Sequence, residues 1–249
     1  GNISKLSKLN LVLSGLNLCA TCAGFAIMYA KLDSMSSLIA DVVEVHKKSQ
    51  GIQTSFEFKK VMSDHRDMLD GRKTQNYYTK EQMRKLVDDE YNVLDLLINT
   101  FREGVSSNRE ELLFSILSLA EMLSVSLQYF DEIYYFENKE RIHNGQYWHL
   151  GHDSWIQSYD TLSSPSFIEM IQDFGCFEMG LNTVENDCFY INFYDQVKGF
   201  KQDVFDNQEM IFAIDDWDLF KNVLDTTNQE IKTDIETAFD NVGLTSDYY

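Results

Sequence analysis

Hydrophobic side chains near the start of the chain recur at intervals of three and four positions. Such spacing places them along one face of an α-helix. No proline interrupts the pattern, and it continues past the first acidic residues to about residue 48. We therefore predict one helix over residues 7–48, on the order of 60 Å long. The stripe begins with Leu6, Leu9, Leu13, Leu16, Ala20, Ala23, Ile27 and Ala30.

The first half of this predicted helix carries no charge. Residues 9–30 lie between Lys8 and Lys31 and include neither acid nor base. A run of that length would cross a bilayer core of ~30 Å, and its small residues at intervals of four would allow close helix packing in lipid. Its interior polar side chains are costly in lipid, however, and the stripe continues beyond Lys31.

Three interpretations of residues 9–30 therefore stay open. They form a core or coiled-coil helix of a soluble protein, a helix that enters a membrane conditionally, or a permanent span. The sequence favours the first, in which the helix packs on its own bundle, on a protein partner or on another copy. The side chains expected to make this partner or membrane contact are Leu9, Leu13, Gly15, Leu16, Cys19, Ala23 and Ile27.

The remaining chain predicts a bundle of helices. A weak break at residues 49–55 precedes a short helix, and residues 70–82 form a loop that ends in a Thr79–Gln82 capping box. The next helix ends at Gly104. Residues 112–136 are apolar nearly all round, which is typical of a central bundle helix, while Glu121 and Gln128 argue against a membrane span. Another helix begins near Pro165.

Two later segments are ambiguous. Residues 188–194 and 209–214 are rich enough in β-formers to predict short strands, which would pair as a small β-hairpin near 188–214, yet both also fit short buried helices. Asp215 and Asp216 then resemble an N-cap of a last helix that starts at Trp217. The fold prediction is mainly α, with a long apolar helix at 1–48 and an acidic helical bundle at 49–249.

Charge restricts the partners. The 249 residues carry a formal net charge of −19, although residues 1–32 contain three lysines and no acid. So acidic a surface repels phosphate backbones, and we therefore expect no nucleic-acid partner. Cys19 and Cys22 have redox-motif spacing, but they lie within the apolar run and fit small hydrophobic side chains better. We expect a cytoplasmic protein, with membrane association as the alternative, and expect residues 1–30 not to be a cleaved signal peptide.

The best candidate for chemistry is the sequence HLGHD at residues 149–153. An adjacent His-Asp pair in an all-helical protein resembles the HD-type metal phosphohydrolases, in which imidazoles and carboxylates hold divalent metals. That resemblance rests on His152 and Asp153, with His149 as a further candidate. The favoured interpretation is a loop whose aromatic and imidazole side chains pack on the bundle. We accordingly expect no metal and no cofactor.

Three functions follow as hypotheses. The first is a helical interaction and assembly protein that binds a partner, or another copy, through its N-terminal helix. The second is a membrane-active effector, similar in design to helical pore-forming toxins, that inserts residues 9–30. The third is a metal-dependent hydrolase that uses His149, His152 and Asp153. No nucleotide-binding, nucleophile-elbow or zinc-protease motif is present, so an enzyme is the least favoured class.

Overall fold

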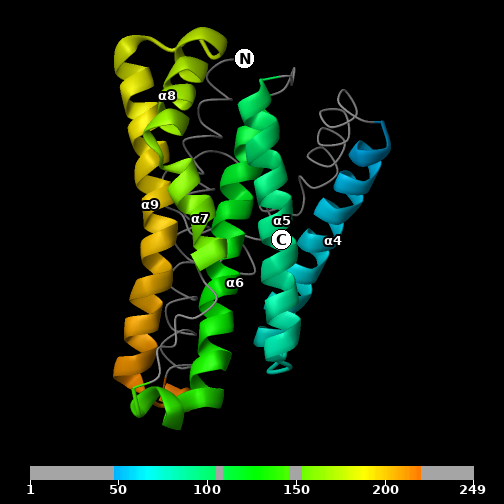
Figure 1. Ribbon diagram of the computed structural model, residues 1–249, viewed down its shortest axis with the longest axis vertical. Coiled ribbons are helices and arrows are strands. Elements are labelled where there is room, and N and C mark those ends of the chain that lie inside the picture. Colours follow the sequence, from blue (N-terminus) through cyan, green and yellow to red (C-terminus); the bar gives the residue numbers. More distant parts are fainter. Residues whose placement is uncertain (1–47, 105–108, 146–152, 220–249) are drawn as a thin grey trace.

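A computed structural model describes residues 48–104, 109–145 and 153–219 (Figure 1). These residues form helices and contain no strand, which confirms a mainly α fold for this part of the chain. The predicted helix over residues 7–48 lies outside the described residues, apart from Lys48. Because the described part begins there, the division into 1–48 and 49–249 stays a prediction. The elements are α4 (Lys48–Lys73), α5 (Lys80–Glu103), α6 (Arg109–His143), α7 (Asp153–Leu162), α8 (Pro165–Asp173), the π-helix η1 (Phe174–Glu178) and α9 (Thr183–Ile214).

The helices are arranged around α6. Helix α5 packs along one side of α6 and α9 along the other, while α4 packs on the outer side of α5. The short helices α7 and α8 follow one another along α9, and α7 also reaches α5. Figure 1 shows α4 and α9 at opposite edges of the bundle, with α8, η1 and the start of α9 together at its upper end.

Helix α6 is the central helix of the bundle, as its apolar sequence predicts, and the neighbouring helices bury it. Every described side chain from Leu112 to Leu127 is buried, including Glu121 and four serines. The Leu112–His143 stretch is the one described helix that is long and apolar enough to cross a membrane, and 94% of its most apolar window lies inside the bundle. A helix enclosed on all sides by other helices requires the same composition.

The predicted β-hairpin near residues 188–214 is wrong, because α9 runs through the whole of it as one helix. The Asn182–Glu185 capping box starts this helix, and its inward residues recur at helical intervals. Burial of that face against α6 outweighs the local β-propensity of the aromatic and β-branched residues. The apolar side chains of this face include Phe189, Phe193, Val197, Phe200, Val204 and Ile211.

Other boundaries are partly as predicted. The Thr79–Gln82 capping box and the Gly104 cap are confirmed, as is the start at Pro165, where the Ser164 side chain caps α8. The predicted break at residues 49–55 is absent, since α4 continues through it. Helix α6 also extends past residue 136 to His143, with non-helical backbone at Asn138.

The two aspartates after α9 have different roles. Asp215 is the C-cap of α9, in the left-handed conformation, and not part of an N-cap. Asp216 does act as predicted, because its Oδ1 accepts a hydrogen bond of 2.8 Å from the backbone N–H of Leu219. The predicted last helix lies mostly outside the described residues.

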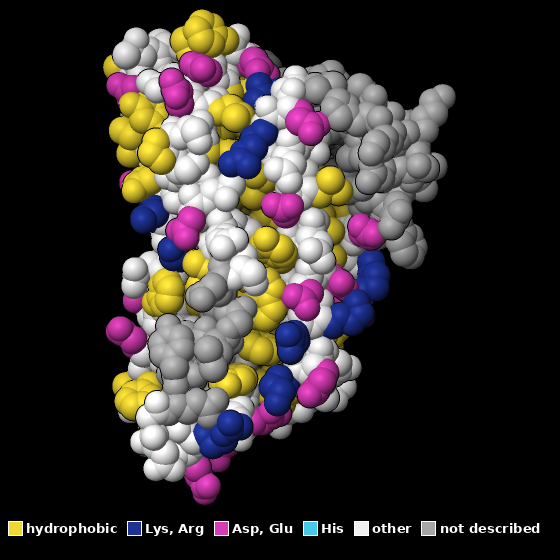
Figure 2. Space-filling view, in the orientation of Figure 1, with side chains coloured by type: hydrophobic (Ala, Val, Ile, Leu, Met, Phe, Trp, Pro, Cys, Tyr) yellow, Lys and Arg dark blue, Asp and Glu magenta, His cyan; other side chains and the backbone are white. Residues whose placement is uncertain are grey.

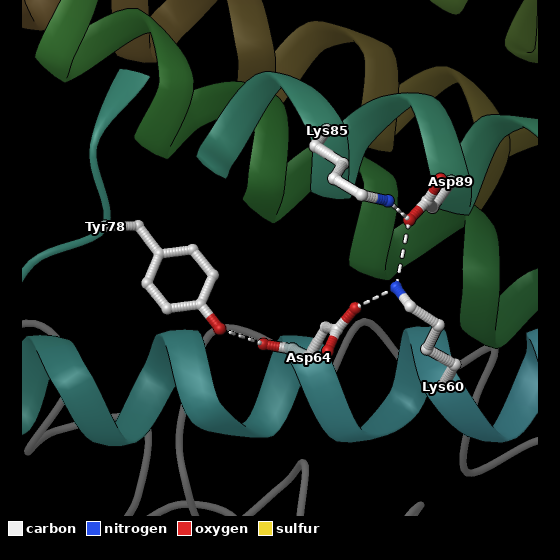
Figure 3. A network of polar contacts seen from close by, with 5 residues as sticks. All are labelled: Lys60, Asp64, Tyr78, Lys85 and Asp89. Carbon is white, nitrogen blue, oxygen red and sulfur yellow. Dashed lines mark hydrogen bonds and ion pairs between the residues drawn. The ribbon is translucent and has the colours of Figure 1, made fainter. Parts of the chain in front are cut away.

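On its exposed side, α4 is joined to α5 by a chain of charged groups (Figure 3). Lys60 Nζ lies 2.5 Å from Asp64 and 3.2 Å from Asp89, which also accepts from Lys85 at 2.6 Å. Tyr78 donates to the backbone carbonyl of Asp64 at 3.1 Å. The lysine hydrogen bonds outweigh partial burial and lower the pKa of Asp89. Because these side chains are partly solvated, each pair adds little stability.

Deeper in the same interface, α4 meets α5 and α6 through buried polar groups. His65 Nδ1 lies 2.7 Å from Glu90 Oε1, and Ser126 donates to that oxygen at 3.0 Å. Arg72 donates to both oxygens of buried Glu132, at 3.0 and 2.9 Å. Burial raises the pKa values of Glu90 and Glu132, and the facing His65 and Arg72 oppose that shift.

Candidate interaction surface

Most of the residues predicted to carry function lie outside the described part of the chain. This applies to His149, His152 and the N-terminal set from Leu9 to Ile27. Asp153 is the first residue of α7. Within the described ranges, no group of three or more His, Cys, Asp or Glu residues could hold a metal ion. The hydrolase hypothesis therefore stays untested at residues 149–153.

The described surface instead carries an unpredicted cluster of exposed hydrophobic side chains. Phe177 is 80% exposed and Val184 is 72% exposed, whereas side chains of this type are normally the first to be buried. We name the cluster the tip surface, because it lies at the α8–η1–α9 end of the bundle. Its members are Phe177, Val184, Cys188, Ile191 and Tyr194.

Figure 2 shows hydrophobic side chains gathered on this upper end of the molecule, over η1 and the first half of α9. Acidic side chains lie among them. Apolar side chains that gather at one place mark contact sites more reliably than scattered ones, which are normal on any protein surface.

The π-helix η1 separates inward from outward aromatic residues. Phe174, its first residue, points into the core and packs edge-on against Phe101 at 5.7 Å. Phe177, three residues later, lies almost fully in solvent. A π-helix inserts an extra residue per turn and so changes which side chains face inward, and such turns recur at functional sites.

Close packing holds η1 against the start of α9. A Cβ on Gly175 would lie 2.1 Å from Asn186 Oδ1, so only glycine allows this approach. Asn186 is itself fixed, because its Nδ2 donates to the Gln172 carbonyl at 2.9 Å. Gly180 then turns the chain with φ of 68°. These contacts therefore fix the exposed tip to the start of α9.

The first half of α9 has two apolar faces. Phe189, Phe193 and Val197 are buried against the bundle, while Val184, Cys188 and Ile191 form a line on the opposite, solvent-facing side. The outer line follows intervals of four and three, which is the spacing of a helix-packing seam. A surface helix needs only one such face, so the second is not explained by the fold.

The segments that form the tip surface carry charge of one sign. Residues 142–197 contain no Lys or Arg and eight acids, so the whole α7–α8–η1 region and half of α9 contribute only negative charge. Close to the apolar side chains are Glu178, Glu185, Asp187 and Asp195. Glu178 pairs with Arg109 of α6. Below the surface, the next base along α9 is Lys198, whose Nζ lies 5.9 Å from the Tyr194 ring centroid.

Two exposed cysteines lie at this end of the bundle. Cys176, on η1, and Cys188, on α9, are free and exposed. Cys188 stands within the apolar line of α9, between Val184 and Ile191. It therefore offers a chemical reporter of whether that line is covered.

Two further polar clusters hold helices together and do not form a binding site. The His65–Glu90–Ser126 group is fully buried, where no solute can reach it. At the lower end of the bundle, Asp215 accepts from Tyr135 at 2.7 Å and lies 3.0 Å from Lys139. That cluster closes the C-terminus of α9 onto α6.

The spacing of apolar residues in the sequence already indicated the tip surface, but the strand-like composition of the segment favoured a different interpretation. Residues 188–194 alternate well enough to suggest a strand, but the set Val184, Cys188 and Ile191 fits a helix if Phe189, Phe193 and Val197 form its other face. Recognising the Asn182–Glu185 capping box would have fixed the helical interpretation.

The chain matches no protein-family model, no curated protein and no solved structure. What it does must therefore be inferred from its own residues.

Proposed function

We propose that the protein is a helical interaction and assembly protein, and that its tip surface binds a helix with an apolar stripe and basic flanks. The observation that carries this proposal is the second apolar face of α9, continued by Phe177 on η1. Leaving that face in water is unfavourable by roughly 25 cal/mol per Å² of apolar area, and a partner removes this cost.

The chemistry of the partner follows from geometry and charge. Val184, Cys188 and Ile191 present the four-and-three spacing into which side chains of another helix fit. The surrounding acids favour lysine or arginine on either side of the partner's apolar stripe, and would repel an acidic helix. Free thiols at Cys176 and Cys188 suit a reducing compartment, which supports a cytosolic location as part of this proposal.

A direct test is fluorescence anisotropy of a labelled, lysine-flanked helical peptide titrated with the full chain. We expect saturable binding that weakens with salt, and at least tenfold weaker binding to Ile191→Asp. Gln202→Asp is the matched control, since it adds the same charge on the same line of α9, about 16 Å further along. The proposal is wrong if Ile191→Asp binds like Gln202→Asp, or if a glutamate-flanked peptide binds equally well.

A membrane-active effector is the second candidate. It is favoured by residues 9–30, an uncharged run long enough to cross a bilayer. Vesicles of neutral and anionic lipids, loaded with a self-quenched dye, would decide between the candidates. Leakage that Ala23→Asp abolishes and Gln202→Asp does not would favour the effector over the assembly protein.

A further inference from the structure

We infer that the tip surface takes residues 9–30 of a second copy of this chain. This inference rests on the proposed function and names its partner. The first support is a shared spacing. Val184, Cys188 and Ile191 follow intervals of four and three along α9, and the stripe through Leu9, Leu13 and Leu16 follows the same intervals. Helices with matching stripes pack side by side along a common seam.

Side-chain size is also complementary. The tip surface presents large side chains, with Phe177 and Val184 the most exposed. The N-terminal run combines leucines with small residues, and Gly15, Cys19 and Ala23 stand four apart. On a helix, Gly15 and Cys19 lie on the face beside the leucine stripe, where they leave room for a large side chain next to the α9 line, such as Phe177.

The charges of the two surfaces are opposite. Residues 1–32 carry Lys5, Lys8 and Lys31 and no acid, whereas residues 142–197 carry eight acids and no Lys or Arg. The whole chain has a net charge of −19, yet residues 1–32 contain no acid that the acidic tip surface would repel. Lys5 and Lys8 stand next to Leu9, at the end of the run whose stripe matches Val184–Ile191, where they would meet acids that flank the apolar line, such as Asp187 and Asp195.

The arrangement of helices favours a second copy over the same chain. Residues 1–47 lead into α4, which packs on the outer side of α5, at the edge of the bundle opposite α9 (Figure 1). Helices α5 and α6 stand between α4 and α9. Exchange of the N-terminal run between two copies satisfies both tip surfaces at once and gives a closed dimer with two equivalent contacts.

The test is complementation between two full-length variants, followed by sedimentation velocity over a concentration series. Ile191→Asp damages the tip surface and Leu16→Asp damages the N-terminal run. Each variant alone should associate at least tenfold more weakly than the wild type. Their mixture should regain association, because one copy supplies an intact run and the other an intact tip surface. Circular dichroism and thermal unfolding identify a misfolded variant, in which case Leu16→Asn replaces Leu16→Asp.

The remaining results separate this inference from the proposed function. If Ile191→Asp weakens association and Leu16→Asp does not, the tip surface binds something else, so the inference is overturned and the proposed function stands. A mixture no more associated than its components overturns the inference, as does a wild type that is monomeric throughout. Retained binding of the lysine-flanked peptide in either case leaves the proposed function intact.

Discussion

Gly175 in η1 and Asn186 in α9 approach so closely that a methyl group on Gly175 would lie 2.1 Å from the Asn186 amide oxygen. The two residues are eleven apart in sequence, and their contact fixes how η1 packs against the start of α9. Since Phe177 extends from η1 and Val184 from α9, this approach sets the shape of the tip surface.

Gly175→Ala should therefore destabilise the protein by about 1–3 kcal/mol, because the added methyl group overpacks a fixed site. It should also weaken binding of the lysine-flanked peptide. Gly199→Ala is the matched control, since a Cβ at Gly199 meets nothing within 4 Å. In the interior of α9 that change should stabilise by about 0.5–1 kcal/mol. Urea unfolding measures both, and equal effects would contradict the packing described.

The buried His65–Glu90 pair predicts a non-additive result. His65→Leu leaves a fully buried carboxylate without its imidazole partner, which should lower the free energy of unfolding by about 3 kcal/mol or more. The double variant His65→Leu/Glu90→Leu removes the stranded carboxylate as well, and should be more stable than His65→Leu alone. Chemical denaturation of the two single variants and the double variant tests this, and additive losses would show that the two side chains do not interact.

Arg72→Lys should not behave as a conservative change. The Arg72 guanidinium donates to both oxygens of Glu132 and lies 3.6 Å from the Tyr129 ring centroid. Both hydrogen bonds come from Nη2. A lysine ammonium lacks the planar face that lies over the Tyr129 ring, so we expect a loss of about 1–3 kcal/mol. Arg66→Lys, on the exposed side of the same helix, should cost less than about 0.5 kcal/mol. Thermal unfolding compares them, and equal melting temperatures would refute the role given to Arg72.

Asp215 predicts a pH dependence at the lower end of the bundle. Hydrogen bonding from Tyr135, followed by Lys139 and His143, lowers the pKa of Asp215 from 3.8 to about 2. Because the folded pKa is the lower one, the stabilisation is complete above about pH 4 and is lost as the pH falls towards 2. The stability difference between wild type and Asp215→Asn should therefore vanish over this range. Asp70→Asn, on the exposed side of α4, serves as the control, and a difference that persists at pH 2 would contradict the assignment.

The parts of the fold that the sequence predicted correctly are those with explicit local signals. The Thr79–Gln82 capping box, the Gly104 cap and Pro165 each identified a helix boundary, and the continuous apolar run identified α6 as the central helix. These features depend on neighbours within a few residues, so the chain reveals them without knowledge of packing.

The features that escaped prediction depend on contacts distant in sequence. Burial against α6 turns residues 188–214 into one helix despite their β-forming composition, and Gly175 acquires its role only when Asn186 lies beside it. The tip surface was missed for the same reason, since Val184 and Ile191 are recognised as exposed only once the opposite face of α9 is known to be buried.

The central claim, that the tip surface is a docking site for a basic, apolar helix, is tested most directly by the alkylation rate of Cys188. Iodoacetamide labelling of the full chain, followed site by site by mass spectrometry, would be measured with and without saturating lysine-flanked peptide. We predict that the peptide slows labelling of Cys188 at least tenfold, and that this protection disappears in Ile191→Asp and persists in Gln202→Asp. An unchanged rate at Cys188 under saturating peptide would contradict the account.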